Sequence, residues 1–338
     1  MAINENQTLT KQDFVSDQDV RWCPGCGDYA ILAQIQKIFP DLGIPKEQFF
    51  IVSGIGCSSR FPYYMDTYGF HSIHGRAPAV ATGVKLANPD LSVWVVTGDG
   101  DAMSIGGNHF IHVLRRNIDL NILMFNNQIY GLTKGQYSPT SELGKITKST
   151  PMGSLDYPFN PPQLALGANG TFIARTIDRE LKHMGKVFTE ASNHHGTSFV
   201  EIYQNCNIYN DGAFSELTEK DTKAESQLVL EHGKPMVFGI NKNKGLVLEG
   251  SNFKVVQLDT NHTQDDILKH NIEDKNLAML LSEITYIQEL PVPIGIIYKE
   301  KKATYEEMLS NQIKDAVKSK GRGDLKKILL GSNYWNVD

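Results

Sequence analysis

The stretch from Val93 to Gly131 constrains the fold more than any other part of the chain. An apolar run, Val93–Val96, ends in the sequence Thr-Gly-Asp-Gly-Asp, and a helix-like stretch follows it. A second apolar run, Asn121–Phe125, ends in an asparagine pair. This order of strand, glycine turn, helix, strand and asparagine pair has the length of one βαβ unit, and it predicts two parallel strands.

The βαβ unit places a carboxylate, Asp99, and a carboxamide, Asn127, at the same end of two neighbouring strands. The glycines on either side of the carboxylate, Gly98 and Gly100, let a phosphate approach the backbone. A hard cation that is held by Asp99 and Asn127 and bridges to a diphosphate is the expected occupant. The spacing resembles the thiamine-diphosphate motif of transketolases, decarboxylases and 2-oxoacid oxidoreductases. An ordinary βαβ unit whose turns use Gly, Asp and Asn is the alternative.

Composition sets the class of protein. The chain has 338 residues, which suggests one large domain or two modest ones, and its 41% hydrophobic and 21% charged residues are typical of a globular protein. A net charge of −5 without a basic cluster argues against a nucleic-acid surface. The polar amino terminus lacks a signal-peptide core, and the apolar runs are too short to span a bilayer. We therefore expect a cytoplasmic protein that has no membrane partner.

Strand and helix patterns alternate along the first two thirds of the chain, which predicts a doubly wound, mostly parallel α/β sheet. The expected helices are Tyr29–Phe39, Ala77–Ala87, Gln163–Leu166 and Arg179–Ser192, and the expected further strands are Phe49–Val52, Thr171–Thr176 and Ser198–Tyr203. Phe61–Ile73 is expected to be a loop. Leu132–Pro162 is a long loop of the kind that forms lids or partner contacts.

We predict three regions: a polar arm at 1–20, an α/β domain at 21–210 and a C-terminal α+β extension at 211–338. The extension is expected to hold a charged helix at Glu216–Glu231, strands within Met236–Leu248 and Phe253–Leu258, an apolar run at Val292–Ile297 and a helix at Tyr305–Lys320. It is expected to cover the site or contact a partner.

The four cysteines are Cys23, Cys26, Cys57 and Cys206, and they do not have the spacing of paired zinc knuckles. Cys57 and Cys206 each follow a predicted strand, so both are expected at the sheet edge that carries Asp99. Four thiolates are the ligand set of a [4Fe-4S] cluster, which would accept single electrons beside a thiamine cofactor. Zinc, a redox pair at Cys23 and Cys26, or buried unliganded thiols remain alternatives.

The chain resembles the β subunit of 2-oxoacid:ferredoxin oxidoreductases, most closely the 2-oxoglutarate type. The resemblance covers about Trp22 to Asn210. It rests on the motifs WCPGCG, GIGCSSR, HSIHGRAPAVATG, GDGDAMSIGGNH, FNNQIYGLTKGQYSPTS and QNCNIYN, which occur in this order.

The resemblance implies a set of ligands for three cofactors. The four cysteines would hold the [4Fe-4S] cluster, and Asp99, Asn127 and the backbone carbonyl of Ile129 would hold Mg²⁺. Thiamine diphosphate would be lined by Ile55, Gly56, Cys57, Ser58, His74, Gly98, Gly100, Asp101, Gly131 and Leu132. His74 could instead have only a surface role. For Asp101 we favour a helix cap or a local hydrogen bond over metal ligation.

The resemblance also implies the reaction. A 2-oxoacid would be oxidatively decarboxylated with coenzyme A to an acyl-CoA and CO₂, and two single electrons would pass through the cluster to ferredoxin. No glutamate near these motifs is a convincing activator of thiamine, and in the family the α subunit supplies it. We therefore expect half an active site, inert alone. The alternatives are a non-redox thiamine enzyme and a structural or assembly subunit without catalysis.

Two cations are candidates for the substrate site. Arg60 follows Cys57 by three residues and Lys134 follows Asn127 by seven, so both are expected near the reacting carbon. A dicarboxylic substrate needs a cation for its second carboxylate, which favours 2-oxoglutarate, giving succinyl-CoA, over pyruvate or a branched or aromatic 2-oxoacid. Either cation could equally pair with a diphosphate oxygen, the backbone near the cluster or an acid of the partner. Gln136, Ser138 and Thr140 could add hydrogen bonds or be ordinary polar loop residues.

Overall fold

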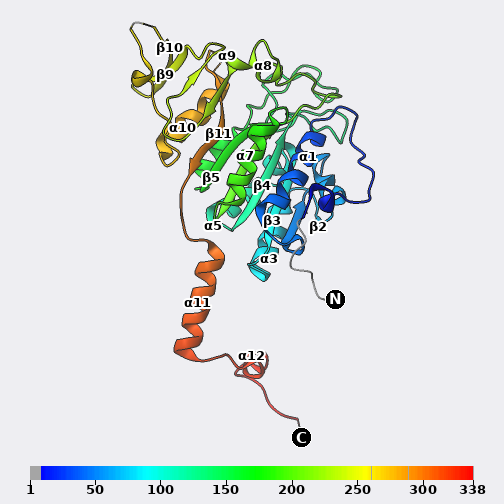
Figure 1. Cartoon of the computed structure of the whole chain (residues 1–338). Coiled ribbons are helices and arrows are strands. Elements are labelled where there is room, and N and C mark those ends of the chain that lie inside the picture. Colours follow the sequence, from blue (N-terminus) through cyan, green and yellow to red (C-terminus); the bar gives the residue numbers. More distant parts are fainter. Residues whose placement is uncertain (1–8, 260, 288, 338) are drawn as a thin grey trace.

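A computed structural model of the chain describes residues 9–259, 261–287 and 289–337, and Figure 1 shows its elements. The α-helices are α1 (Asp28–Ile38), α2 (Phe61–Tyr64), α3 (Ala77–Ala87), α4 (Asp99–Met103), α5 (Gly107–Arg116), α6 (Pro161–Gly167), α7 (Leu181–Ser192), α8 (Ser215–Thr218), α9 (Lys223–Ser226), α10 (Lys275–Glu283), α11 (Tyr305–Lys320) and α12 (Leu325–Leu330). The strands are β1 (Phe49–Ser53), β2 (Tyr68–His71), β3 (Ser92–Gly98), β4 (Leu120–Asn126), β5 (Phe172–Ile177), β6 (Thr197–Tyr203), β7 (Gln227–Leu230), β8 (Val237–Phe238), β9 (Lys244–Glu249), β10 (Asn252–Gln257) and β11 (Val292–Lys299).

Eight strands form the central sheet in the order β2-β1-β3-β4-β6-β5-β11-β7. From β2 to β5 all neighbours are parallel, and β11 joins β5 antiparallel while pairing parallel with β7. The predicted doubly wound, mostly parallel sheet is therefore confirmed. Parallel pairing aligns the carboxyl ends of β1, β3, β4 and β6 along one edge, and the site lies there.

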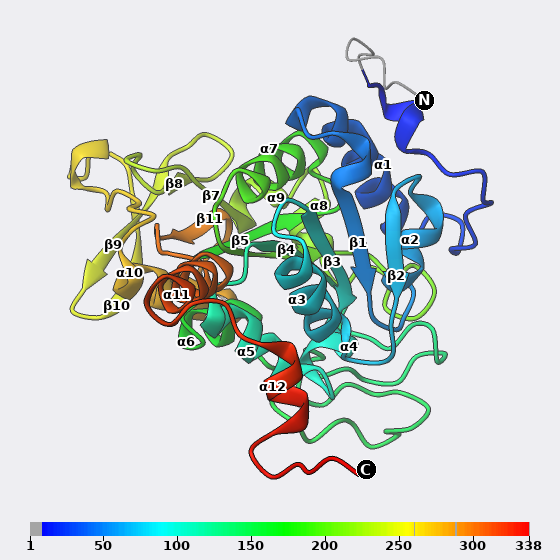
Figure 2. The same cartoon turned by 90° about the horizontal axis from the view of Figure 1, so that it is seen from below.

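Helices cover both faces of the sheet, as the views in Figures 1 and 2 show. On one face α1 and α7 contact each other and present apolar side chains three and four residues apart, among them Ile31 and Ile35 on α1 and Met184 and Phe188 on α7. On the other face α3, α5 and α6 pack against the same strands. Burial on both faces explains why β4 and β6 are buried throughout.

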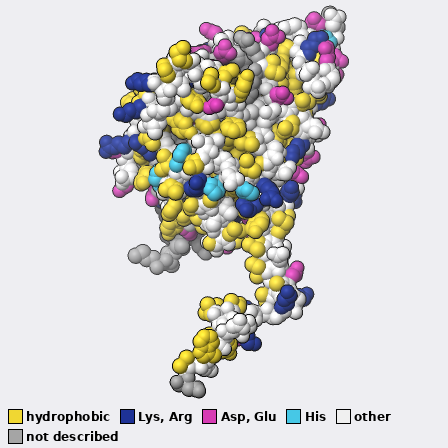
Figure 3. Space-filling model, turned by 180° about the vertical axis from the view of Figure 1, so that it is seen from behind, with side chains coloured by type: hydrophobic (Ala, Val, Ile, Leu, Met, Phe, Trp, Pro, Cys, Tyr) yellow, Lys and Arg dark blue, Asp and Glu magenta, His cyan; other side chains and the backbone are white. Residues whose placement is uncertain are grey.

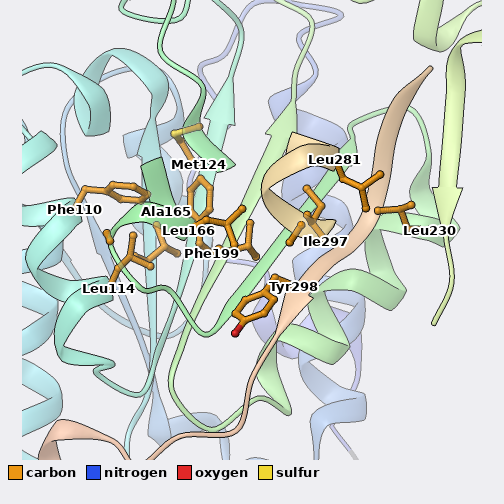
Figure 4. Close-up of a cluster of buried hydrophobic side chains, with 14 of the residues drawn as sticks. Phe110, Leu114, Met124, Ala165, Leu166, Phe199, Leu230, Leu281, Ile297 and Tyr298 are labelled. Carbon is orange, nitrogen blue, oxygen red and sulfur yellow. The ribbon is translucent and has the colours of Figure 1, made fainter. Parts of the chain in front are cut away.

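The apolar core runs without a break into the C-terminal third of the chain. Figure 4 shows Phe110, Leu166 and Phe199 in one cluster with Leu281 and Ile297. Because β7 and β11 are strands of the main sheet, residue 211 is not a boundary of that sheet. The part of the extension that forms a lobe of its own is the antiparallel sheet β10-β9-β8, which bears out the strands predicted there.

Four expectations about local structure need correction. Residues 61–73 are not all loop, because they include α2 and the exposed edge strand β2, and residues 216–231 form α8, α9 and β7 instead of one helix. The helix after Gly98 is broken into α4 and α5. Residues 1–8 of the predicted polar arm lie outside the described residues, but Phe14 within it is buried against Phe39 and Phe49.

The helix Ala77–Ala87 and the helix Tyr305–Lys320 have the predicted bounds. The second begins with a capping box, in which the Thr304 hydroxyl accepts the Glu307 N–H and the Glu307 carboxylate accepts the Thr304 N–H. In the described ranges no helix has the length and apolarity that crossing a membrane would require.

Candidate functional site

A cavity of about 1050 Å³ opens at the carboxyl edge of β1, β3 and β4. Strand register brings its walls together, since Ser53 pairs with Val96 and Gly98 pairs with Phe125. The cavity is lined by every residue predicted to contact the thiamine cofactor and by all three predicted Mg²⁺ ligands: Ile55, Gly56, Cys57, Ser58, His74, Gly98, Asp99, Gly100, Asp101, Asn127, Ile129, Gly131 and Leu132. The structure thus brings together residues that are up to 77 positions apart, counting from Ile55 to Leu132.

Asp99 is the most constrained carboxylate in the cavity wall. It is only 2% exposed, and its Oδ2 accepts hydrogen bonds from Ser138 Oγ at 2.5 Å and Thr140 Oγ1 at 2.6 Å. Burial raises the pKa of Asp99 to about 6, and the two hydroxyl donors oppose that rise. Ser138 and Thr140 therefore bind the carboxylate that is predicted to ligate the metal. These two bonds tie the long loop 132–160 to the cavity wall.

The two residues of the asparagine pair lie in different places, one in the core and one at the cavity. The first, Asn126, is buried and donates from Nδ2 to Glu201 Oε1 at 2.8 Å. The second, Asn127, lines the cavity, donates from Nδ2 to Gln204 Oε1 at 2.9 Å and accepts the Ile129 N–H on Oδ1 at 3.2 Å. These bonds fix an amide oxygen and the Ile129 segment beside Asp99, and such oxygen donors suit Mg²⁺.

Asp101 has local partners, as predicted. Its Oδ1 accepts the N–H groups of Ile55 at 3.1 Å and Gly75 at 2.7 Å and lies 2.7 Å from His74 Nδ1. Its Oδ2 accepts the Thr97 hydroxyl at 2.7 Å. Both carboxylate oxygens are thus occupied by protein donors that join three segments of the wall. His74 is oriented by this bond, and its predicted contact with a phosphate oxygen stays a prediction.

No residue with a side chain fits at Gly100, which is next to Asp99 in the cavity wall. A Cβ atom there would lie 2.2 Å from the Tyr130 ring, which packs over the glycine and donates its hydroxyl to the Gly100 carbonyl at 2.9 Å. Gly54 is equally tight, because its Cβ would lie 1.8 Å from Asp101 Oδ2. The glycines therefore provide close approach to the backbone at this wall.

Two of the cysteines, Cys57 and Cys206, lie together at the wall of the cavity that Cys57 and Gly131 line. A Cβ atom on Gly131 would be in ordinary contact with two sulfurs, Cys206 Sγ at 3.6 Å and Cys57 Sγ at 3.7 Å. Cys26 Sγ accepts a hydrogen bond from Gln204 Nε2 at 3.3 Å, and Cys23 is exposed beyond it. Burial raises the pKa of the Cys57 thiol to about 12 and raises that of Cys26 further, and nearby cysteines add to both shifts.

All four cysteines are free thiols. In the part of the chain that the structure describes, no group of three or more His, Cys, Asp or Glu side chains is arranged around a point where a single metal ion would fit. A compact tetrahedral zinc site is therefore not preformed by these thiols. A cluster of several iron atoms needs ligands that are spaced more widely than those of one ion.

Asp28 is a cavity residue that the sequence did not single out. It is 1% exposed, and neither carboxylate oxygen has an oxygen or nitrogen donor among the described residues. Burial raises the pKa of Asp28 to about 7, while the neighbouring Cys26 side chain lowers it. Its only sequence signal was a carboxylate directly after the Cys-Gly pair of the first motif.

The two predicted substrate cations do not line the cavity. Arg60 donates from Nη1 to the Arg21 carbonyl at 3.0 Å and lies in a separate hollow with Asp19 and Tyr63. Arg60 ends the short turn Ser58–Arg60 and is not among the residues that line the cavity, and its predicted place beside the reacting carbon stays a prediction. Lys134 is exposed in a turn next to the lining residues, and its substrate role stays a prediction.

Three comparisons relate this geometry to known proteins. Residues 54–202 match the family described as thiamine pyrophosphate enzyme, C-terminal TPP binding domain. The 2-oxoglutarate oxidoreductase subunit KorB of Mycobacterium tuberculosis is 51% identical, with 98% of this chain and 90% of that protein covered. The 2-oxoacid:ferredoxin oxidoreductase subunit beta of Saccharolobus solfataricus is 35% identical, with 86% of each covered.

A solved structure shares the fold over nearly the whole chain. It is a 2-oxoglutarate:ferredoxin oxidoreductase from Magnetococcus marinus with 2-oxoglutarate, coenzyme A and succinyl-CoA bound. The TM-score is 0.75 at 32% identity, and 97% of each chain is covered.

Proposed function

The chain belongs to the β-subunit family of 2-oxoacid:ferredoxin oxidoreductases, and we propose that it binds thiamine diphosphate for the oxidative decarboxylation of 2-oxoglutarate. In this proposal coenzyme A takes the succinyl group, CO₂ leaves, and two electrons pass to ferredoxin. The observation that carries it is the meeting of Asp99, Asn127 and the cysteines at one edge of the sheet.

The cavity fits thiamine diphosphate with Mg²⁺. Asp99, the Asn127 amide oxygen and the Ile129 carbonyl would hold the cation, and the diphosphate would lie in the cavity that Gly98 and Gly100 line. Thiamine diphosphate, when bound, supplies the electron sink for decarboxylation. The chain's own residues orient the proposed metal ligands. Ser138 and Thr140 orient Asp99, and Gln204 orients Asn127.

We propose that Cys23, Cys26, Cys57 and Cys206 hold a [4Fe-4S] cluster in this chain. Two observations support this over unliganded thiols. The Cys57 and Cys206 sulfurs both lie beside Gly131, which itself lines the cavity, so the sulfurs border the proposed thiamine site. Burial also disfavours free thiolates here, and iron would supply the positive charge that stabilises them.

We propose further that a partner α subunit completes the active site. Among the described residues that line the cavity, four are aspartates and none is a glutamate. Thiamine activation needs an acidic group at its aminopyrimidine ring, so a glutamate from the partner is the proposed source. Tyr157 on the long loop lines the cavity and is exposed, and Met152 and Leu155 of the same loop are exposed apolar side chains that such a subunit would cover.

The choice of 2-oxoglutarate rests on the relatives named for that substrate, because Arg60 does not reach the cavity. Pyruvate or a branched or aromatic 2-oxoacid is the second candidate. A structural subunit without catalysis is disfavoured by the intact metal and thiol residues. The free thiols are in keeping with a reducing compartment, and we propose the cytoplasm.

The test is to co-produce the chain with its α subunit and to purify the complex without oxygen. We expect dye reduction that needs both coenzyme A and a 2-oxoacid, with kcat/KM for 2-oxoglutarate at least about tenfold above that for pyruvate, and succinyl-CoA as the product by mass spectrometry. A larger rate with pyruvate would replace the substrate. Turnover that does not depend on coenzyme A would contradict the reaction.

A further inference from the structure

The last described segment forms an arm that stands away from the body of the molecule. We call residues 305–330, which hold α11 and α12, the C-terminal arm. Figures 1 and 3 show it projecting from the sheet domain into open space. Apart from the buried Glu306, its side chains are largely exposed, and they include Ile313 and Val317 on α11.

The base of the arm is fastened to the body, so its direction is set by the fold. Thr304 is fully buried, and Asn117 Nδ2 donates to the carbonyls of residues 302 and 303 at 3.2 Å each. Glu306 Oε1 accepts the Asp119 N–H at 2.9 Å. Glu307 Oε1 lies 2.9 Å from His195 Nε2. A helix that is anchored at its base and has exposed apolar side chains indicates a surface for interaction with another molecule.

The tip of the arm combines apolar and basic side chains. In α12, Leu325 is 69% exposed, Ile328 71% and Leu329 76%, and Lys326 and Lys327 lie between them. The link from α11 contains Gly321 at φ +77° and a second glycine two residues later, which leaves α12 free to adjust its angle. Covering such leucine and isoleucine side chains removes apolar surface from water, which favours docking.

A groove of matching character lies on the small lobe. It has a volume of about 430 Å³ between β10 and the end of α10, and its apolar wall includes Phe253, Leu280, Ile284 and Ile287. Two exposed acids, Glu283 and Glu289, form part of its lining, and Lys254, the one cation among its described lining residues, is paired with Glu249 at 2.6 Å. In the described part of the chain neither glutamate belongs to an ion pair.

We propose that α12 of one copy docks in this groove on a second copy of the chain. The apolar face of α12 would fill the apolar wall, and Lys326 and Lys327 would meet Glu283 and Glu289. Within one copy the groove and α12 lie at opposite ends of the molecule, so the contact joins two copies (Figure 1). Exchange of two such arms closes a dimer with two identical contacts.

Charge across the whole chain favours a second copy as the occupant. From residue 316 to the end the chain has five Lys and Arg against two Asp, whereas the complete chain has 33 basic and 38 acidic residues. The basic tip of the arm is thus attracted to the acidic body of another copy of the same chain. The α subunit is the other occupant that the experiment must distinguish.

The experiment uses the complete α–β complex and a zero-length carbodiimide cross-linker, which joins lysines to carboxylates only in direct contact. We expect a covalent product of twice the 37.7 kDa chain, in which peptides with Lys326 or Lys327 are joined to peptides with Glu283 or Glu289. Cross-links from these lysines to the α subunit alone, or no product at twice the chain mass, would overturn the proposal.

Charge exchange makes the test specific. Lys326→Glu with Lys327→Glu should lower the yield of that product at least about tenfold, because attraction becomes repulsion. Adding Glu283→Lys and Glu289→Lys should restore it with the charges reversed. The control, Lys182→Glu with Lys186→Glu on the exposed side of α7, should leave it unchanged. Loss without restoration by the fourfold variant would place α12 on another surface. Activity does not enter this readout, so failure of the proposed function would leave the result intact.

Discussion

At the scale of single residues, the site depends on how Asp99 is held. Its carboxylate is buried at the start of α4, and two hydroxyls of the long loop donate to the same oxygen. Both hydroxyls donate to Oδ2, and the carboxylate is the proposed ligand of the cation. A hydrogen bond to a charged group contributes about 1.5–3 kcal/mol, so each hydroxyl should matter measurably.

We predict that Thr140→Val weakens Mg²⁺-dependent binding of thiamine diphosphate by about tenfold or more, because the buried Asp99 loses a donor at 2.6 Å. Calorimetric titration of the complex at several Mg²⁺ concentrations measures this. Thr147→Val is the matched control, since Thr147 bonds Ser149 and Thr150 in the same loop and does not contact Asp99. Equal weakening in both variants would show that the loop, and not the bond to Asp99, is responsible.

A second prediction concerns the thiols. Cys206→Ser should reduce iron from about four atoms per chain to below about one, because a cluster loses one of its four ligands. Binding of thiamine diphosphate should stay within about threefold of the original, since Asp99 and Asn127 are unchanged. Metal analysis and calorimetry on the same sample give both values. Iron that remains at its full level in this variant would place the cluster in the partner subunit.

The positions of the proposed ligands at the strand ends were predictable, while the residues that support them were not. Asp99, Asn127, Cys57 and Cys206 each follow an apolar run, and parallel topology alone brings strand ends together. The donors to Asp99 come from about forty residues away in a loop without regular structure, so no local pattern assigns them. Arg60 lines a different hollow from Cys57, because proximity in sequence to a cysteine does not fix the direction of a side chain.

At the scale of elements, buried strands and helices rich in small residues had clear sequence patterns. Exposed strands, and strands that pair with distant parts of the chain, did not. β2 is exposed at all four positions and has no alternation to detect. β7 exists because it pairs with β11 some sixty residues later, which overrides the helical character of its charged surroundings. The gap between α4 and α5 begins at Ser104, whose ψ of −115° lies outside the helical region, and a Cβ atom on Gly106 would lie 2.4 Å from the Asp101 carbonyl.

The opposite edge of the sheet gives a pH-dependent prediction. His194 is buried with Nε2 at 2.8 Å from Thr171 Oγ1, whose hydroxyl donates to Asn117, so the imidazole is the neutral donor. Burial lowers the pKa of His194 to about 4, below its usual 6.5. The contribution to stability is complete above pH 6.5 and is lost as the pH falls toward 4, because the unfolded chain binds the proton first.

We therefore expect the free energy of unfolding to decrease between pH 6.5 and 4 by up to about 1.4 kcal/mol per pH unit through this group. His194→Gln keeps a donor for Thr171 and should remove that part of the slope in urea titrations. His262→Gln, in the small lobe, should keep the original slope. If His194→Gln retains the full slope, another group is responsible.

At the scale of the whole molecule, the chain is one continuous core with an open site at one edge. The C-terminal third completes the sheet through β7 and β11, adds the small lobe and ends in the arm. The sequence predicted the parallel sheet well because its strands are buried on both faces. It could not show that the predicted extension shares that sheet, because strand order depends on pairing across the chain.

The open site leads to a prediction for the chain without its partner. The described cavity lining has no glutamate, so the chain alone should bind thiamine diphosphate with Mg²⁺ and turn over 2-oxoacid at less than about one thousandth of the rate of the complex. Adding purified α subunit should restore the rate. An α subunit in which the glutamate that activates thiamine is replaced by glutamine should not restore it. Full turnover by the chain alone would contradict the proposed half site.

The central claim is that one sheet edge of this chain holds both thiamine diphosphate and an iron–sulfur cluster. The most direct measurement is the content of iron, acid-labile sulfide and thiamine diphosphate in the chain purified alone without oxygen. We expect about four irons, about four sulfides and one thiamine diphosphate per chain when Mg²⁺ is present. Zinc in place of iron, or a colourless chain whose partner carries all the iron, would contradict it.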